Sequence, residues 1–295
     1  MMKKLLFILN PRSGKGQIKN NLLGIVDTFI KNNYETTLHI TQDILDAKNK
    51  VISDGEKYNL IVCSGGDGTL NETLSGIMEA GLDIPLGYIP AGSTNDFAAS
   101  LRLPKNMHKA AEIATGEKTF LCDVGMFNDR YFAYVAAFGA FTEVSYATPQ
   151  QMKNVLGHPA YIIEGIKKLT SIKSAKISVR YDGNIIEGDF IYGMITNSIS
   201  VGGFKKLVGK SVYMDDGLFE VTLIRRPKNP LELQEIMAAI LMEEMTSNNM
   251  YTFKASELEI HSPEEVPWVL DGEYGGVPKQ IIIRNLHQAI KIMHI

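Results

Sequence analysis

The sequence predicts an α/β domain with an open, mainly parallel sheet, followed by an antiparallel β-sandwich domain. In the first 125 residues, short apolar runs alternate with longer amphipathic stretches, which is typical of strand–helix units. After them, short strands follow one another closely around tight-turn pairs such as Asp182-Gly183. A chain of 295 residues is long enough for two domains of about 100–200 residues each. We therefore expect domains at 1–127 and 128–295, with a last strand that can return to the first domain.

The first domain begins with an apolar run, Lys4–Leu9, which Asn10-Pro11 ends. Apolar residues at helical spacing then predict a helix over 20–32, and Gly81 follows another predicted helix where a glycine commonly ends one. In chain order the expected elements are strand 4–9, helix 20–32, strand 34–40, helix 44–55, strand 59–64, helix 70–80, strand 86–89, helix 105–115 and strand 120–124.

The second domain is expected to open with a hairpin around Asn128-Asp129 and to continue as alternating strands. Two helical stretches, about 150–169 and 231–245, interrupt it. The expected strands are 124–127, 131–138, 176–181, 185–195, 218–224, 257–261, 267–270, 280–284 and 289–293. Because no linker or low-complexity tract separates the halves, we expect them to pack around a shared cleft.

The composition excludes several classes of protein. With 45% apolar and 21% charged residues, the chain is not disordered. A net charge of −3 argues against general polyanion binding, so no nucleic acid is expected. Cys63 and Cys122 lie in apolar runs and are expected to be buried free thiols. The N-terminal apolar run ends after Leu9, and no run reaches the ~18 residues of a membrane span. We expect a cytoplasmic protein that meets a membrane only from its inner face.

The strongest local signal is Ser64–Glu72, with the sequence SGGDGTLNE, between a predicted strand and a predicted helix. Gly65, Gly66 and Gly68 allow a tight turn and a close approach to a ligand. The helix that follows directs backbone N–H groups at the loop, which suits phosphate oxygens. Asp67 would repel a bare phosphate, but it fits a site that also holds a divalent cation or an acceptor hydroxyl.

Two further loops follow predicted strands, NPRSGKG at 10–16 and PAGSTNDF at 90–97. The first is not a Walker P-loop, because Gly16 stands where serine or threonine is required. Loops at the carboxyl ends of strands in an open α/β sheet meet at one crevice. Together the three loops predict a phosphate-binding crevice.

These motifs resemble the diacylglycerol kinase catalytic-domain family, in the branch of bacterial soluble lipid kinases that includes those of Gram-positive bacteria. The second half adds YATP at 146–149, DDGLF at 215–219 and DGEYGG at 271–276. The resemblance implies a phosphofructokinase- or NAD-kinase-like nucleotide domain, ATP at the sheet and lipid in the cleft. It also implies Mg²⁺-dependent phosphorylation of diacylglycerol to phosphatidic acid, with ADP as the other product.

The resemblance also implies roles for individual residues. Glu273 would be the general base, and Asp67 would lie near the catalytic Mg²⁺ and the phosphates. The predicted ATP contacts are Asn10, Pro11, Arg12, Ser13, Gly14, Lys15, Gly16, Thr41, Gly66, Asp67, Gly68, Thr69, Leu70, Asn71, Glu72, Ser93 and Thr94. The resemblance does not decide whether the hydroxyl of Ser93 or that of Thr94 contacts ATP.

A structural Mg²⁺ is the second metal that the resemblance implies. Asp216 would bind it together with carbonyl oxygens of Tyr213 and Leu218, and Asp123 would connect it to the active site. The segment 206–214 is longer than the family pattern, so the carbonyl ligands are less well defined than Asp216.

The chemistry of phosphoryl transfer explains why these residue types matter. The reaction needs mainly positioning and charge neutralisation. The hydroxyl of a lipid alcohol has a very high pKa, so a carboxylate must accept its proton, and Glu273 follows a turn that can present it at the cleft. Other lipid alcohols remain open as substrates: a sphingoid base, a polyprenol or phosphatidylglycerol. An NAD kinase, favoured only by GGDGT, and a non-catalytic nucleotide-binding regulator are further alternatives.

Contact with a membrane surface is expected to be transient. Over 150–212, nine basic residues stand against four acidic ones. Basic residues near an anionic leaflet contribute ~1 kcal/mol each, so this segment can dock reversibly. A homodimer is implied by the resemblance alone.

Overall fold

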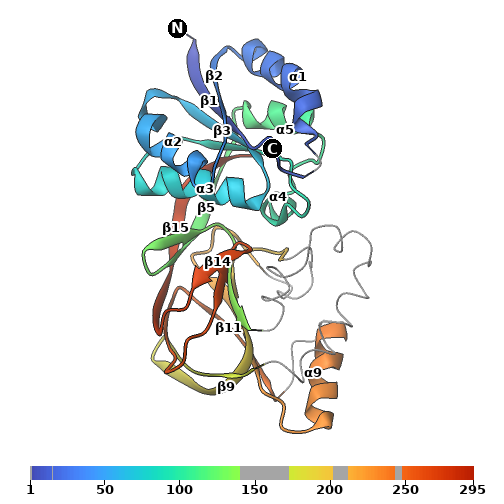
Figure 1. Cartoon of the computed structure of the whole chain (residues 1–295), viewed down its shortest axis with the longest axis vertical. Coiled ribbons are helices and arrows are strands. Elements are labelled where there is room, and N and C mark those ends of the chain that lie inside the picture. Colours follow the sequence, from blue (N-terminus) through green and yellow to red (C-terminus); the bar gives the residue numbers. More distant parts are fainter. Residues whose placement is uncertain (1, 15, 140–172, 202–211, 243–247) are drawn as a thin grey trace.

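The computed structural model describes residues 2–14, 16–139, 173–201, 212–242 and 248–295. Two bodies lie along the long axis (Figure 1). The N-terminal body combines helices with parallel strands, and the C-terminal body is built mainly from antiparallel strands. The predicted fold class is confirmed. The expected helix over 150–169 lies outside the described residues.

The N-terminal body is a parallel sheet in the order β2-β1-β3-β4, covered by helices on both faces. Leu6 and Ile8 of β1 pack with helices α2 and α3, whereas Leu5 and Phe7 pack with α1 and α5. Both faces of the central strands are therefore apolar, which explains their continuous apolar sequences. The elements are β1 (Lys3–Leu9), α1 (Ile18–Lys31), β2 (Tyr34–Ile40), α2 (Asp46–Asp54), η1 (Gly55–Lys57), β3 (Leu60–Gly65), α3 (Asp67–Glu79), β4 (Leu86–Pro90), α4 (Asp96–Ser100) and α5 (Met107–Ala114).

The C-terminal body encloses its own core, in which Trp268 packs between Phe127 and Phe138 at ring-centroid distances of 5.2 and 4.9 Å. The hairpin at Asp182-Gly183 is confirmed, with φ angles of 45° and 76°. The elements are β5 (Thr119–Phe127), β6 (Arg130–Phe132), β7 (Val135–Gly139), β8 (Ala175–Tyr181), β9 (Asn184–Thr196), β10 (Phe219–Arg225), α9 (Pro230–Met242), β11 (Met250–Ala255), β12 (Glu257–His261), β13 (Trp268–Leu270), β14 (Glu273–Gly276) and β15 (Gln280–Met293).

Strand β15 connects the two bodies. It pairs antiparallel with β12 and β5 and, at Ile292, parallel with Leu86 of β4. The separate strands expected at 280–284 and 289–293 are therefore one strand, with a register shift between Leu286 and Ile290. The last strand thus reaches the first sheet, while the division at residues 127 and 128 stays a prediction.

Three other expectations about elements are corrected. Helix α2 begins at Asp46 and not at residue 44, because Leu45 has a φ of 64° and cannot continue a helix. Helix α3 begins at Asp67, so the central residues of the glycine motif form its first turn. The expected strand 131–138 is two strands, β6 and β7, interrupted at 133–134. The sequence patterns missed α4, β11 and β14, which are at most six residues long.

Both cysteines are free and buried, as predicted, and burial raises the pKa of Cys63 to about 12. Within the described ranges, no helix has the length and apolar character needed to cross a bilayer.

Candidate active site

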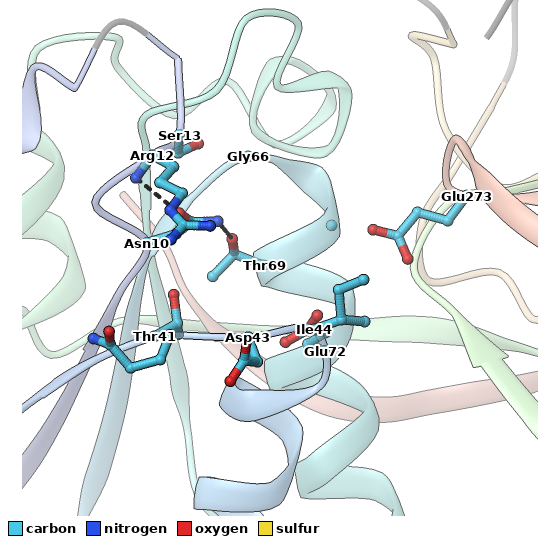
Figure 2. Close-up of a pocket in the computed structure, with 12 residues that line it drawn as sticks. Asn10, Arg12, Ser13, Thr41, Asp43, Ile44, Gly66, Thr69, Glu72 and Glu273 are labelled. Carbon is cyan, nitrogen blue, oxygen red and sulfur yellow. Dashed lines mark hydrogen bonds between the residues drawn. The ribbon is translucent and has the colours of Figure 1, made fainter. Parts of the chain in front are cut away.

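The site is a cleft of about 490 Å³ at the carboxyl ends of the parallel strands. Residues that follow β1, β2 and β3 line it, and Glu273 from β14 closes it from the C-terminal body (Figure 2). Among the described residues, its lining comprises Asn10, Arg12, Ser13, Thr41, Gln42, Asp43, Ile44, Gly66, Gly68, Thr69, Glu72 and Glu273. The two bodies therefore share one cavity, as the sequence predicted.

The loop after β1 is joined to the first turn of α3 by a side-chain hydrogen bond. Asn10 Nδ2 donates to Thr69 Oγ1 at 3.2 Å, and the Arg12 backbone N–H donates to Asn10 Oδ1 at 2.9 Å. The Asn10 N–H itself donates to the carbonyl of Ser64 at 2.9 Å. These bonds place the Arg12 and Ser13 side chains at the cleft beside the start of a helix, where backbone N–H groups favour an anion.

Glycines allow the strand-end loops to pack backbone against backbone. Gly14 has a φ of +56°, and a Cβ there would lie 2.3 Å from the carbonyl oxygen of Ala91. A Cβ on Gly92 would lie 2.6 Å from the Cα of Gly66. Asn95 fixes this third loop, because its side chain accepts from the Gly92 N–H and donates to the Gly92 carbonyl, both at 2.8 Å.

Asp67 is a partly buried carboxylate in the first turn of α3. It accepts hydrogen bonds from the backbone N–H groups of Asp96 at 3.2 Å and Phe97 at 3.4 Å. Burial raises the pKa of Asp67 to about 7, and the negative charge of Asp96 adds to the effect. Such a carboxylate is poorly compensated by the protein, and a neighbouring cation would stabilise its charged form.

Glu72 holds the segment that lines the floor of the cleft. Its two carboxylate oxygens accept from the backbone N–H groups of Leu45 at 2.9 Å and Ala47 at 3.3 Å. Burial, and then the negative charge of Glu273, raise the pKa of Glu72. Asp43 and Ile44 are presented at the cleft by the segment that Glu72 anchors, and Ile44 is 84% exposed.

Glu273 lies against the first turn of α3. A Cβ added to Gly68 would be only 2.6 Å from Glu273 Oε1, so the glycine leaves room for this carboxylate. Figure 2 shows Glu273 pointing from the C-terminal body toward the start of α3. The exposed carboxylate is thus close to the first turn of α3 and open to a ligand.

The turn before Glu273 is anchored by Asp271, a buried side chain to which no role was assigned from the sequence. Its carboxylate accepts from the backbone N–H groups of Ala133 at 2.5 Å and of Tyr134 and Val135, both at 3.0 Å. A fourth bond comes from the side-chain amide of Asn71. These bonds satisfy the backbone donors at the interruption between β6 and β7. Burial raises the pKa of Asp271 to about 6, and the four hydrogen bonds oppose the rise.

Not every predicted contact lies at the cleft. The Leu70 side chain is fully buried in the apolar core, and its contact with a nucleotide stays a prediction. Asn71 is turned toward the C-terminal body. Lys15 lies outside the described residues. The other predicted residues that do not line the described cleft are Pro11, Gly14, Gly16, Asp67, Ser93, Thr94 and Asp123. Gln42, Asp43 and Ile44 were missed, although they follow the end of β2 as the other loops follow their strands.

Asp216, the acid expected to hold a structural metal, makes two contacts within the protein. Asp216 Oδ1 accepts from the Leu218 N–H at 3.0 Å, and Oδ2 forms an ion pair with Lys254 at 3.0 Å. In the described part of the chain, no three acidic, histidine or cysteine side chains form a metal-binding cluster. The Asp216 carboxylate is thus compensated by a backbone donor and a lysine of the chain itself. The ligand set Asp216, Tyr213 and Leu218 stays a prediction.

Asp123 holds the turn that contains Asp216 and Gly217. It is buried, and its carboxylate accepts from the N–H groups of Gly217 and Gln288, both at 2.7 Å. It therefore ties the 213–218 segment to β15, which explains a buried acid at this position without a metal.

Comparisons with known proteins place these features in a family. Residues 4–127 match the diacylglycerol kinase catalytic domain, and residues 135–294 match the YegS C-terminal NAD kinase β-sandwich-like domain. The chain is 32% identical to a diacylglycerol kinase of Bacillus subtilis (strain 168), over 99% of this chain and 96% of that protein. It is 36% identical to a diacylglycerol kinase of Staphylococcus epidermidis, over 99% of this chain and 92% of that protein.

Solved structures from Bacillus anthracis str. Sterne share the fold. One has a TM-score of 0.83 at 25% identity and covers 99% of this chain and 95% of its own. Another, a diacylglycerol kinase, has a TM-score of 0.77 at 22% identity and covers 99% of this chain and 97% of its own. The fold, the glycine-lined cleft and these matches define an enzyme of the kinase class. The chain belongs to the diacylglycerol kinase catalytic-domain family, which confirms the resemblance identified from its motifs.

Proposed function

We infer that this protein is a diacylglycerol kinase, which phosphorylates the hydroxyl of diacylglycerol and produces phosphatidic acid. The observation that carries this function is the position of Glu273, whose carboxylate lies against Gly68 in a cleft lined by the strand-end loops. A phosphate held by the loops would therefore face a base. The relatives named diacylglycerol kinase support this choice of substrate.

We propose that ATP binds with its phosphates at the first turn of α3 and the loop after β1. The kinase family implies the use of ATP. Gly66, Gly68 and Thr69 would supply backbone and hydroxyl donors, and Arg12 would supply positive charge. Thr41 lies at the same cleft and is placed to contact the remainder of the nucleotide.

The charge balance of the cleft fits a requirement for Mg²⁺. Its described lining carries three carboxylates, those of Asp43, Glu72 and Glu273, and one guanidinium, that of Arg12. A triphosphate would add further negative charge. Mg²⁺ commonly binds through one or two carboxylates and substrate phosphates, and Asp67 is the partly buried carboxylate that would neighbour it. When bound, Mg²⁺ would neutralise charge on the phosphates.

Glu273 would accept the proton of the lipid hydroxyl as the new bond to phosphorus forms. Its exposed carboxylate lines the cleft, and we propose that the lipid alcohol binds between it and the phosphates. Asp67 would act by charge and position rather than by proton transfer, because Glu273 lines the described cleft and Asp67 does not.

A panel of acceptors tests the proposed function. The protein is incubated with γ-labelled ATP and Mg²⁺ together with diacylglycerol, a sphingoid base, a polyprenol, phosphatidylglycerol or NAD. We expect label in phosphatidic acid and at most trace label elsewhere. Preferential labelling of another lipid would assign that lipid as the substrate, and labelling of NAD would support the NAD kinase alternative. Binding of ATP without transfer to any acceptor would support the regulator.

Replacing Gly14 with alanine is expected to weaken ATP binding. The substitution places a Cβ 2.3 Å from the Ala91 carbonyl oxygen at a φ of +56°, so the first and third loops must separate. Strained positions of this kind cost about 1–3 kcal/mol. Gly81→Ala is the matched control, since Gly81 has a φ of +61° but no atom within 4 Å of an added Cβ. Calorimetric titration with an ATP analogue should show weaker binding for Gly14→Ala alone, and equal affinities would contradict the proposed loop packing.

Peripheral docking at the inner face of the membrane remains a proposal, as does a homodimer. Most of the basic residues that support docking lie in 150–172 and 202–210, outside the described residues. Lys173, Lys176 and Arg180 are the described members of this segment.

A further inference from the structure

Asn71 was expected to contact ATP, but its side chain is engaged elsewhere. Its Nδ2 donates to Asp271 Oδ2 and to the carbonyl of Tyr131, the latter at 3.4 Å. Its Oδ1 accepts from Ser75 Oγ at 3.2 Å. Both groups of the amide are therefore used within the protein, and two of the three partners belong to the C-terminal body.

Asn71 lies on the face of α3 that contacts the turn carrying Glu273. Gly68 and Asn71 are three residues apart, so they lie on the same face of the helix one turn from each other. That face meets the turn of residues 271–273 twice: Glu273 lies against Gly68, and Asp271 is bonded to Asn71. Of these two contacts, only the second is a hydrogen bond.

Asp271 links the Asn71 hydrogen bond to the position of Glu273, because it holds the turn from which Glu273 projects. It is 5% exposed, has a φ of 51°, and is bonded to three consecutive backbone N–H groups of residues 133–135. Its own N–H donates to the Val135 carbonyl at 2.9 Å. The turn is thus rigid within the C-terminal body, and the Asn71 amide sets where that rigid unit stands along α3.

We propose that Asn71 is a positioning residue, which acts through Asp271 to hold the Glu273 carboxylate over the phosphate-binding turn of α3. The inference rests on the proposed role of Glu273 as base. Asn71 itself does not touch the substrate. A shift of about 1 Å in a reacting group can lower a rate by about a hundredfold. Loss of the hydrogen bond that positions Glu273 is therefore expected to slow the reaction.

The first test separates this role from ATP binding. Asn71→Ala is expected to lower kcat by about tenfold to a hundredfold and to leave the Kd of an ATP analogue unchanged. Asn32→Ala is the matched control, because Asn32 Nδ2 also joins two elements, through Thr115 at 3.0 Å, but both belong to the N-terminal body. Weaker ATP binding at unchanged kcat would instead make Asn71 a nucleotide contact and overturn the proposal.

The second test asks whether the effect passes through Asp271 and Glu273. Asn71→Asp should be worse than Asn71→Ala, because two carboxylates then face each other. Adding Asp271→Asn restores a donor and an acceptor and should recover part of the lost rate. In a Glu273→Gln background, Asn71→Ala should lower the residual rate much less than in the wild type. Failure of the rescue, together with additive effects, would overturn the proposal.

Amide hydrogen exchange tests the positioning role of Asn71 independently of whether Glu273 is the base. If Glu273→Gln retains turnover, the base assignment fails whatever Asn71 does. In that case, faster amide exchange over 271–276 in Asn71→Ala, with unchanged exchange in Asn32→Ala, still supports Asn71 as the contact that positions the turn. Unchanged exchange in both variants would overturn it.

Discussion

Replacing Glu273 with glutamine is expected to lower kcat by about a hundredfold to ten-thousandfold while ATP still binds. Glutamine keeps the size of the side chain but cannot accept the proton of the lipid hydroxyl. Because Glu273 is exposed at the end of a turn that Asp271 anchors, the substitution should not disturb the fold. Initial rates with diacylglycerol, and calorimetric titration with an ATP analogue, measure the two quantities.

Glu265→Gln is a suitable control for this prediction, because Glu265 is an exposed acid of the same body that does not line the described cleft. It should turn over at the wild-type rate. Near-normal turnover of Glu273→Gln would remove Glu273 from the role of base. Loss of ATP binding in the same variant would make it a nucleotide contact instead.

Replacing Asp67 with asparagine is expected to lower kcat by about a hundredfold to a thousandfold, the size typical of losing one preorganised electrostatic contact. The change removes a negative charge beside the proposed Mg²⁺ and phosphates but keeps the shape of the side chain. The concentration of Mg²⁺ at half-maximal rate should rise. Asp83→Asn, a change in an exposed ion pair with Lys291, should alter neither quantity. An unchanged dependence on Mg²⁺ would contradict the proposed place of Asp67.

The same substitution has a predictable effect on stability. Folding raises the pKa of Asp67 from 3.8 to about 7, so the ionised carboxylate is less favourable in the folded chain than in the unfolded one. Asp67 therefore destabilises the wild type increasingly as pH rises from about 4 to about 7. In the presence of EDTA, the free energy of unfolding of Asp67→Asn relative to the wild type should increase over this interval. A decrease would show that the ionised carboxylate is stabilised in the folded protein.

The sequence predicted the glycine-lined part of the cleft because its signals are local. A strand, a glycine-rich turn and a helix fix the positions of Gly66, Gly68 and Thr69 with little help from the rest of the chain. Glu273 was found through the motif that the family resemblance supplied. Nothing in its own neighbourhood distinguishes it from a solvated acid in a turn.

The missed features depend on packing between distant segments. Asn71 lies inside the glycine motif, and only the folded chain brings Asp271 to it. Helix α2 was predicted to begin two residues early, because Leu45 adopts a left-handed conformation while Glu72 holds its N–H. Strand β15 was divided in two because its register shift interrupts the alternation of apolar residues.

The proposed reaction requires a triphosphate between the loop after β1 and Glu273. The most direct measurement is a crystal structure of the Glu273→Gln variant with Mg²⁺ and a non-hydrolysable ATP analogue. We predict that the terminal phosphate lies against Gly66–Thr69, with residue 273 on its far side and room for one hydroxyl between them. A nucleotide bound elsewhere, or a terminal phosphate pointing away from residue 273, would contradict the proposed roles of this loop and of Glu273.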